Sequence, residues 1–162
     1  MDLSHLQRID TSRSERIEVL ETLPWSWDLS FDLLSDLASY LSAYQLVEGQ
    51  VLFSEGDRGA FMVFLIGGRI EIRKDSSPVG EVLVVRFQEG KVFGEMPLLD
   101  GGPRSASAVA MADSKVYLLT QEAFFRMKKE HPRLAMMIVL KLARILSQRL
   151  RRTTGKWAEL LA

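Results

Sequence analysis

The residue types that recognise a phosphorylated sugar are gathered in one segment, residues 93–110 (FGEMPLLDGGPRSASAVA). Gly94 permits a close backbone approach, and a short helical turn with Pro97 at its start would point free N–H groups at an anion. The Glu95 carboxylate only accepts hydrogen bonds and therefore suits a sugar hydroxyl. Arg104, set among small residues, matches a phosphate with two parallel donors. The segment therefore predicts a site for a ribose that bears a phosphate.

A simpler interpretation of the same residues is an internal ion pair between Glu95 and Arg104. A buried ion pair is by itself weak evidence for function. The small and turn-forming neighbours Gly94, Pro103 and Ala106 favour a ligand site instead. No nucleophile stands beside a base in this segment, so we expect a binding protein and not an enzyme.

The composition of the chain limits the other classes of function. Lys and Arg together number 21, as do Asp and Glu, so the formal net charge is zero and DNA binding is not expected. There is no cysteine, and the two histidines, His5 and His131, are far apart, so no metal site and no cofactor are expected. No apolar run of about 18 residues predicts a membrane span, and residues 1–10 lack the apolar region of a secretory signal, so a cytoplasmic location is expected.

Helical patterns occupy the N-terminal segment, residues 1–43. Apolar residues recur at helical spacing over 14–23, and a second helix is predicted after Ser30. The connector holds Trp25 and Trp27, which are expected to pack inside. Residues 1–11 are polar and are expected to be frayed.

The pattern changes to strands between residues 44 and 120. Short apolar or alternating runs are separated by glycine turns, which is typical of an all-β barrel or roll. The predicted strands lie near 51–53, 61–66, 70–72, 81–87, 105–111 and 115–119.

Helix returns over residues 121–162. One helix is predicted over 121–130, and a longer one from Pro132 to about Thr154, where Gly155 would end it. An apolar stripe on the long helix is either core or a dimer seam, and its length favours a homodimer through this helix. The basic residues near its end are interpreted as a solvated helix end, with binding to nucleic acid or acidic lipid as the alternative.

Two motifs together resemble the cyclic-nucleotide-binding domains of catabolite-activator-type regulators, protein kinase A regulatory subunits and cyclic-nucleotide-gated channels. One is Phe93-Gly94-Glu95 followed by Pro103-Arg104, and the other is the segment 51–72 with its Glu-Gly-Asp turn. The resemblance implies an α+β fold. It would be an eight-stranded antiparallel β-roll (jelly-roll-like, a double-stranded β-helix) flanked by N-terminal helices and a long C-terminal helix. Residues 93–110 would be its phosphate-binding cassette.

The resemblance also implies roles for individual residues. Glu95 would bind the ribose 2′-hydroxyl, and Arg104 would bind the cyclic phosphate. The Ser107 hydroxyl matches a position that can contact a guanine amino group. The remaining implied site residues supply backbone N–H groups near the phosphate or line the apolar side of the pocket: Gly94, Met96, Ser105 and Ala106 for the first, and Val84, Val85 and Phe93 for the second.

The sequence departs from the family pattern in two places. Ala60 stands where the family has an acidic residue, and the last helix offers no matching residue to cap the base. No DNA-reading domain follows the long helix, so a stand-alone sensor is expected. It would bind cAMP or cGMP and signal to an unidentified downstream protein through its C-terminal helices. The alternative is a scaffold for protein interactions whose cassette is degenerate and binds no nucleotide.

Overall fold

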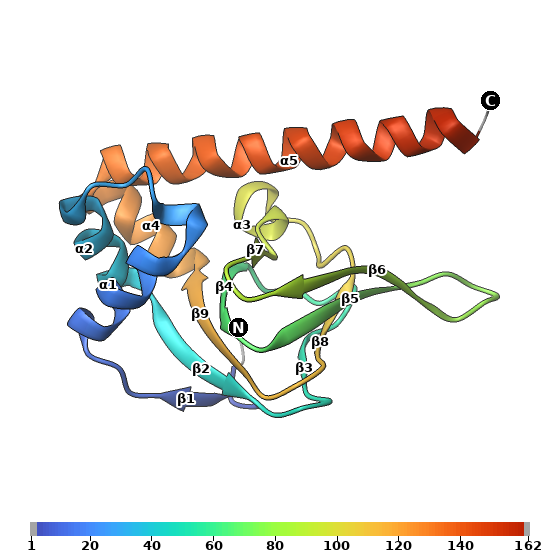
Figure 1. Cartoon of the computed structure of the whole chain (residues 1–162), viewed down its shortest axis with the longest axis horizontal. Coiled ribbons are helices and arrows are strands. Elements are labelled where there is room, and N and C mark those ends of the chain that lie inside the picture. The colour runs from blue at the N-terminus through green and yellow to red at the C-terminus, as the bar shows by residue number, and fades with distance from the viewer. Residues whose placement is uncertain (1–2, 161–162) are drawn as a thin grey trace. The chain divides into compact units, whose positions relative to one another are not determined.

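The computed structural model describes residues 3–160, and the chain divides into two compact units with the boundary after Phe124. The first unit contains three α-helices, a 3-10 turn and nine strands (Figure 1). In chain order they are β1 (Gln7–Ile9), α1 (Arg13–Thr22), η1 (Pro24–Ser26), α2 (Phe31–Tyr40), β2 (Ser42–Leu46), β3 (Val51–Phe53), β4 (Phe61–Gly67), β5 (Arg69–Asp75), β6 (Glu81–Gln88), β7 (Val92–Phe93), α3 (Met96–Asp100), β8 (Ser107–Ala110) and β9 (Ser114–Thr120). Helix α4 (Gln121–Glu130) crosses the boundary between the units, and α5 (Pro132–Leu160) belongs to the second.

The strands form two antiparallel sheets, one in the order β1-β2-β9-β4-β7 and the other in the order β3-β8-β5-β6. In Figure 1 the β5–β6 hairpin extends beyond the rest of the two sheets. The predicted mixed fold with an antiparallel β-roll is confirmed. The described residues contain nine strands, however, and not the eight that were expected.

Three of these strands, β1, β2 and β7, were not among those predicted from the sequence, and β1 lies in the N-terminal segment where fraying was expected. Its residues Gln7 to Ile9 pair with β2, and Gln50 Nε2 donates to the His5 carbonyl at 2.6 Å. The polar sequence concealed this strand, because β1 is at a sheet edge and keeps its side chains largely exposed. The expectation of a frayed start is therefore wrong for the described residues.

Strand β4 lies at the centre of the core. Its first five residues are all buried, because its neighbours β9 and β7 cover its edges and apolar side chains cover both faces. One face joins a core cluster built from both sheets, which includes Phe61, Val63, Leu65, Ile70, Phe93, Ala108, Val116 and Leu118. A strand buried on both faces reads as a continuous apolar run, which is why FMVFLI was recognisable in the sequence.

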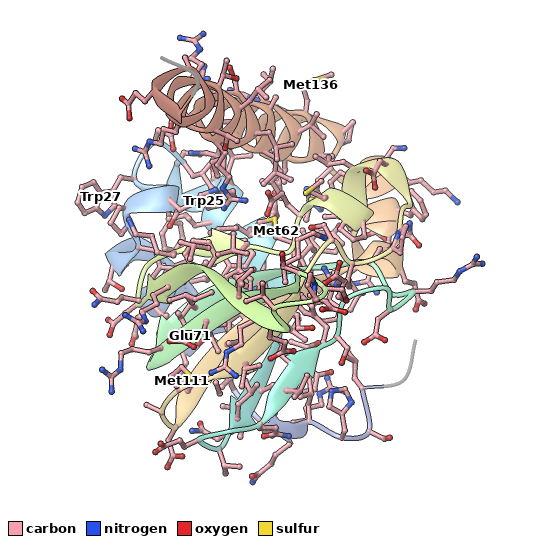
Figure 2. All side chains as sticks on the ribbon, turned by 90° about the vertical axis from the view of Figure 1, so that its right-hand side faces the viewer. Trp25, Trp27, Met62, Glu71, Met111 and Met136 are labelled. Carbon is pink, nitrogen blue, oxygen red and sulfur yellow. The ribbon has the colours of Figure 1, made fainter. Side chains whose placement is uncertain are left out.

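The opposite face of β4 meets the N-terminal helical segment. The Trp25 ring packs edge-on against Phe64 with a centroid distance of 5.0 Å. Trp27 is 72% exposed, so the expectation that both tryptophans pack inside is wrong for Trp27. Figure 2 shows Trp27 at the margin of the molecule, with Trp25 further inside.

In the second unit, α5 continues through Gly155, where the sequence predicted its end. A glycine inside a helix costs about 1 kcal/mol relative to alanine, which a long helix tolerates. The hydroxyls of Thr153 and Thr154 donate to the carbonyls of Arg149 and Leu150, one turn earlier. Among residues 3–160, no helix combines the length and the apolar character needed to cross a bilayer.

Glu71 lies at the centre of a charge cluster on the outer face of the four-stranded sheet (Figure 2). Its carboxylate accepts hydrogen bonds from Arg86 at 2.8 Å and Arg73 at 2.9 Å, which lower its pKa below 4.5. Because the folded pKa is the lower one, the stabilisation is complete above pH about 4.5 and is lost as the pH falls through the folded value.

We therefore expect the difference in melting temperature between the wild type and Glu71→Gln to shrink as the pH falls from 7 to 3. Thermal unfolding followed by circular dichroism at each pH measures it. A difference that stays constant over this range would contradict a role for the ionised carboxylate.

Candidate functional site

The predicted cassette begins where β7 ends. Gly94 has φ +72°, a left-handed conformation that favours glycine, and Glu95 then caps the five-residue helix α3. Pro97 lies in the first turn of α3, as the sequence predicted, and Gly101 closes the helix by donating its N–H to the Pro97 carbonyl at 3.0 Å. The Glu95 side chain is carried on this turn and is only 1% exposed.

Arg104 is held at the centre of the site by its own backbone. Its N–H donates to the Asp57 carbonyl at 3.0 Å, and its carbonyl accepts from the Gly56 N–H at 2.9 Å. The Glu-Gly-Asp turn after β3 thus fixes the segment that carries the arginine. A second contact between these segments comes from the Glu55 N–H, which donates to Ser107 Oγ at 2.9 Å.

The Arg104 guanidinium is buried, with the residue only 3% exposed. It contacts the faces of two aromatic rings, with its central carbon 4.0 Å from the centroid of Phe53 and 4.1 Å from that of Phe61. Its Nη1 donates to the Gly94 carbonyl at 2.7 Å and to the Phe61 carbonyl at 3.1 Å. Two backbone carbonyls and two ring faces therefore hold the cation.

The other donors of Arg104 have no such partners. Among residues 3–160, its Nε and Nη2 atoms are buried without a hydrogen-bond acceptor. Burial lowers the pKa of the guanidinium to about 10, against the opposing attraction of the Asp57 and Glu95 carboxylates. Unpaired buried donors cost free energy, so a site that retains them is suited to an acceptor that arrives from outside.

The geometry also bears on the alternative of an internal ion pair. The guanidinium donates its hydrogen bonds to carbonyls and not to the Glu95 carboxylate, which acts on it through electrostatic attraction. Glu95 and Arg104 are thus both buried and close enough to interact, while part of the arginine's donor capacity is left over. This arrangement favours an anionic ligand over a closed pair.

Comparison with known proteins agrees with this geometry. The family model "Cyclic nucleotide-binding domain" matches residues 44–131, which is more than half of the chain. The chain belongs to the cyclic nucleotide-binding domain family. The match begins in β2 and ends after α4, so it includes the cassette, the four-stranded sheet and the other sheet apart from β1 and the start of β2.

Relatives of this cyclic nucleotide-binding domain include bacterial regulators. The "Cyclic AMP receptor protein" of Thermus thermophilus is 32% identical over 117 residues, which are 72% of this chain and 52% of that protein. A "CRP-like cAMP-activated global transcriptional regulator" of Mycobacterium tuberculosis is 26% identical over 79% of this chain and 55% of its own length. The chain thus spans about half the length of these relatives.

Solved structures share the fold. The crystal structure of a cyclic nucleotide-binding domain from Methylobacillus flagellatus has a TM-score of 0.81 at 25% identity, covering 94% of this chain and 88% of that one. The catabolite activator protein of Thermus thermophilus has a TM-score of 0.75 at 28% identity, covering 85% and 62%.

Within the domain, the structure brings some predicted site residues together and separates others. Gly94 and Glu95 lie beside Arg104, Gly94 through its carbonyl and Glu95 through electrostatic attraction, and the Phe93 ring packs against that of Phe53 with a centroid distance of 6.4 Å. Ser105 Oγ lies 3.8 Å from Met96 Sδ, which joins the two ends of the cassette. The Ser107 hydroxyl, expected to face a guanine, already accepts the Glu55 N–H.

The two predicted valines on β6 differ in their placement. A row of paired residues runs across the four-stranded sheet from Val85 on β6. Val85 pairs with Ile72 on β5, Ile72 pairs with Ala108 on β8, and Ala108 pairs with Phe53 on β3. Directly paired residues share a face of a sheet, so Val85 lies on the same face as the ring that contacts Arg104. Val84 is the extra residue of a bulge between Leu83 and Val85 and is 57% exposed.

The cavity that Arg104 lines differs from the predicted pocket. It has a volume of about 320 Å³ and is bounded by residues of the N-terminal segment and of the β3–β4 connection, including His5, Phe53, Asp57 and Phe61. Of the ten predicted site residues, only Arg104 lines it, so the structure does not place Val84 and Val85 there.

Sequence reasoning missed the groups that support Arg104 and the cassette. Phe53 and Phe61 look like ordinary core residues, and only the fold shows that they flank a cation. Lys74 Nζ donates to the Ser105 carbonyl at 2.8 Å and to Glu55 at 2.6 Å, although Lys74 lies outside the strands predicted from the sequence. The alternation through Ile70 and Ile72 was the available signal, since it continues toward Lys74.

Proposed function

We propose that this domain binds a cyclic mononucleotide, cAMP or cGMP, as a signalling sensor and passes the change to a partner through its C-terminal helices. The observation that carries the proposal is the buried Arg104 guanidinium, whose Nε and Nη2 donors lack acceptors among residues 3–160. A cyclic phosphate supplies two oxygens to a guanidinium, and a ribose supplies the hydroxyl that the neighbouring Glu95 carboxylate can accept from. The names of both bacterial relatives refer to cAMP.

Sensing requires more than binding. The ligand must have different affinities for two arrangements of the C-terminal helices, because it cannot otherwise shift their populations. The formal net charge of zero favours a protein partner, or a second copy of this chain, over nucleic acid as the molecule that receives the signal. The homodimer through α5 remains a prediction.

Isothermal titration calorimetry with cAMP, cGMP and a cyclic dinucleotide tests the proposal. We expect saturable binding of one cyclic mononucleotide and little heat from its linear counterpart, 5′-AMP or 5′-GMP, which carries the same base and sugar but no phosphate ring. Absence of heat with both cAMP and cGMP at near-millimolar concentration would overturn the proposal and favour the scaffold without a ligand.

The proposed role of Glu95 gives a separate prediction. Glu95→Gln should weaken binding of the cyclic mononucleotide by about tenfold, because a hydrogen bond to a charged acceptor contributes about 1.5 kcal/mol or more. The 2′-deoxy form of the same nucleotide lacks the hydroxyl, so the wild type and the variant should bind it equally. Titration of both proteins with both ligands measures the difference. An equal loss with the deoxy ligand would show that Glu95 acts on something other than the 2′-hydroxyl.

A further inference from the structure

The Arg104 guanidinium is turned inward in the structure. Its Nε and Nη2 atoms lie beneath the surface, and its Nη1 is engaged by the carbonyls of Gly94 and Phe61. A phosphate oxygen must come within about 2.7–2.9 Å of an N–H to accept a charge-assisted hydrogen bond. Ligand binding therefore requires the guanidinium, or the groups that cover it, to move.

Phe61 holds this inward position in two ways. Its ring lies 4.1 Å from the guanidinium carbon, and its backbone carbonyl accepts from Nη1 at 3.1 Å. The Phe53 ring also contacts the guanidinium, and it packs edge-on against the Phe61 ring with a centroid distance of 5.8 Å. A desolvated cation over aromatic ring faces is stabilised by their quadrupoles.

The backbone at Phe61 also reaches the start of α4. Phe61 is the register partner of Thr120, the last residue of β9. The neighbouring Ala60 carbonyl accepts from the Gln121 N–H at 2.9 Å, and Thr120 Oγ1 accepts from the Ala123 N–H at 3.2 Å. The residue that holds the arginine is thus paired with the cap of the first helix after the β-roll.

We propose that Phe61 is a positioning residue that holds Arg104 inward in the free protein and transmits its displacement to the first turn of α4. The inference rests on the proposed function, because it names how the nucleotide site is regulated. A phosphate that draws the guanidinium outward removes a donor from the Phe61 carbonyl. This carbonyl lies at the start of β4, next to Ala60, whose own carbonyl accepts the hydrogen bond from the Gln121 N–H.

The proposal predicts that removing the Phe61 ring raises the affinity for nucleotide, whereas simple damage to the core would lower it. If Arg104 must leave its inward position before nucleotide binds, only the fraction of molecules with Arg104 displaced can bind, and the apparent affinity falls by that fraction. Phe61→Leu keeps the site apolar but removes the ring, so nucleotide should bind about three- to tenfold more tightly. Phe64→Leu is the matched control, since Phe64 is on the same strand, is also buried and packs against Trp25 instead. It should leave the affinity unchanged or weaken it.

Two further measurements separate positioning from structure. In the nucleotide-free protein, the Arg104 Nε proton should show an upfield ring-current shift by NMR that is reduced in Phe61→Leu and retained in Phe64→Leu. Nucleotide should speed hydrogen exchange of the Gln121 amide in the wild type and in Phe64→Leu, and less so in Phe61→Leu.

Equal affinities in Phe61→Leu and the wild type, or an unchanged Arg104 proton shift, would overturn the proposal. The proton shift is read without any ligand, so it tests the role of Phe61 even if neither cAMP nor cGMP binds. Failure of nucleotide binding with a normal proton shift would instead count against the proposed function.

Discussion

Replacing Arg104 by alanine is expected to weaken binding of the cyclic mononucleotide at least about 30-fold. Truncating one partner of a buried, hydrogen-bonded charge pair costs about 2–5 kcal/mol, and each 1.4 kcal/mol corresponds to about tenfold in affinity. The loss is large because the guanidinium is buried and the buried Glu95 carboxylate beside it would lose its nearby cation. Calorimetric titration of the variant with the nucleotide that binds the wild type measures it.

Two variants make this result specific. Arg13→Ala removes an equally charged side chain that is half exposed on α1 and lies 3.9 Å from Asp36, so nucleotide affinity should not change. Arg104→Lys keeps a positive charge but loses the two-pronged geometry, and should bind more weakly than the wild type and more tightly than the alanine variant. Near-normal affinity in an Arg104→Ala protein that circular dichroism shows to be folded would contradict the assignment of the phosphate site.

The cassette could be predicted from the sequence because its signals are local. Three residues of the cassette have types that match their local backbone. These are Gly94 at a positive φ, Pro97 in a first helical turn and Gly101 at a helix end. The long apolar run of β4 is similarly local, since burial on both faces needs no knowledge of its partners. Such features identify the element and its ends without its surroundings.

The supporting groups of the site could not be predicted because they depend on pairing between distant segments. Phe53 and Phe61 come from different sheets and meet only when the roll folds around Arg104. Periodicity alone assigns both to the core, which is correct but incomplete. The same limit explains β1, whose polar residues form a strand only because β2 offers a free edge. Its sequence contains no alternation from which to infer it.

The turn between β4 and β5 should be the least tolerant of an added methyl group. Gly68 has φ +91°, and a Cβ built there would lie 2.6 Å from the Asp113 carbonyl oxygen and 2.7 Å from the Ser114 Cα. Gly68→Ala therefore has two costs. Holding alanine at a positive φ costs about 1–3 kcal/mol, and the backbone shift that relieves the steric clash costs about 1–3 kcal/mol more. We expect a loss of about 2–5 kcal/mol in the free energy of unfolding, or about 5–15 °C in melting temperature for a chain of this size.

Gly80→Ala is the matched control for this prediction. Gly80 has φ +88°, nearly the same backbone strain, but an added Cβ would meet no atom within 4 Å. Its loss should therefore be limited to the strain, about 1–3 kcal/mol. Thermal and urea unfolding of both variants give the comparison. Equal losses would mean that the start of β9 moves aside at no cost. That outcome would contradict a rigid connection between the β4–β5 turn and β9, the strand that leads to α4.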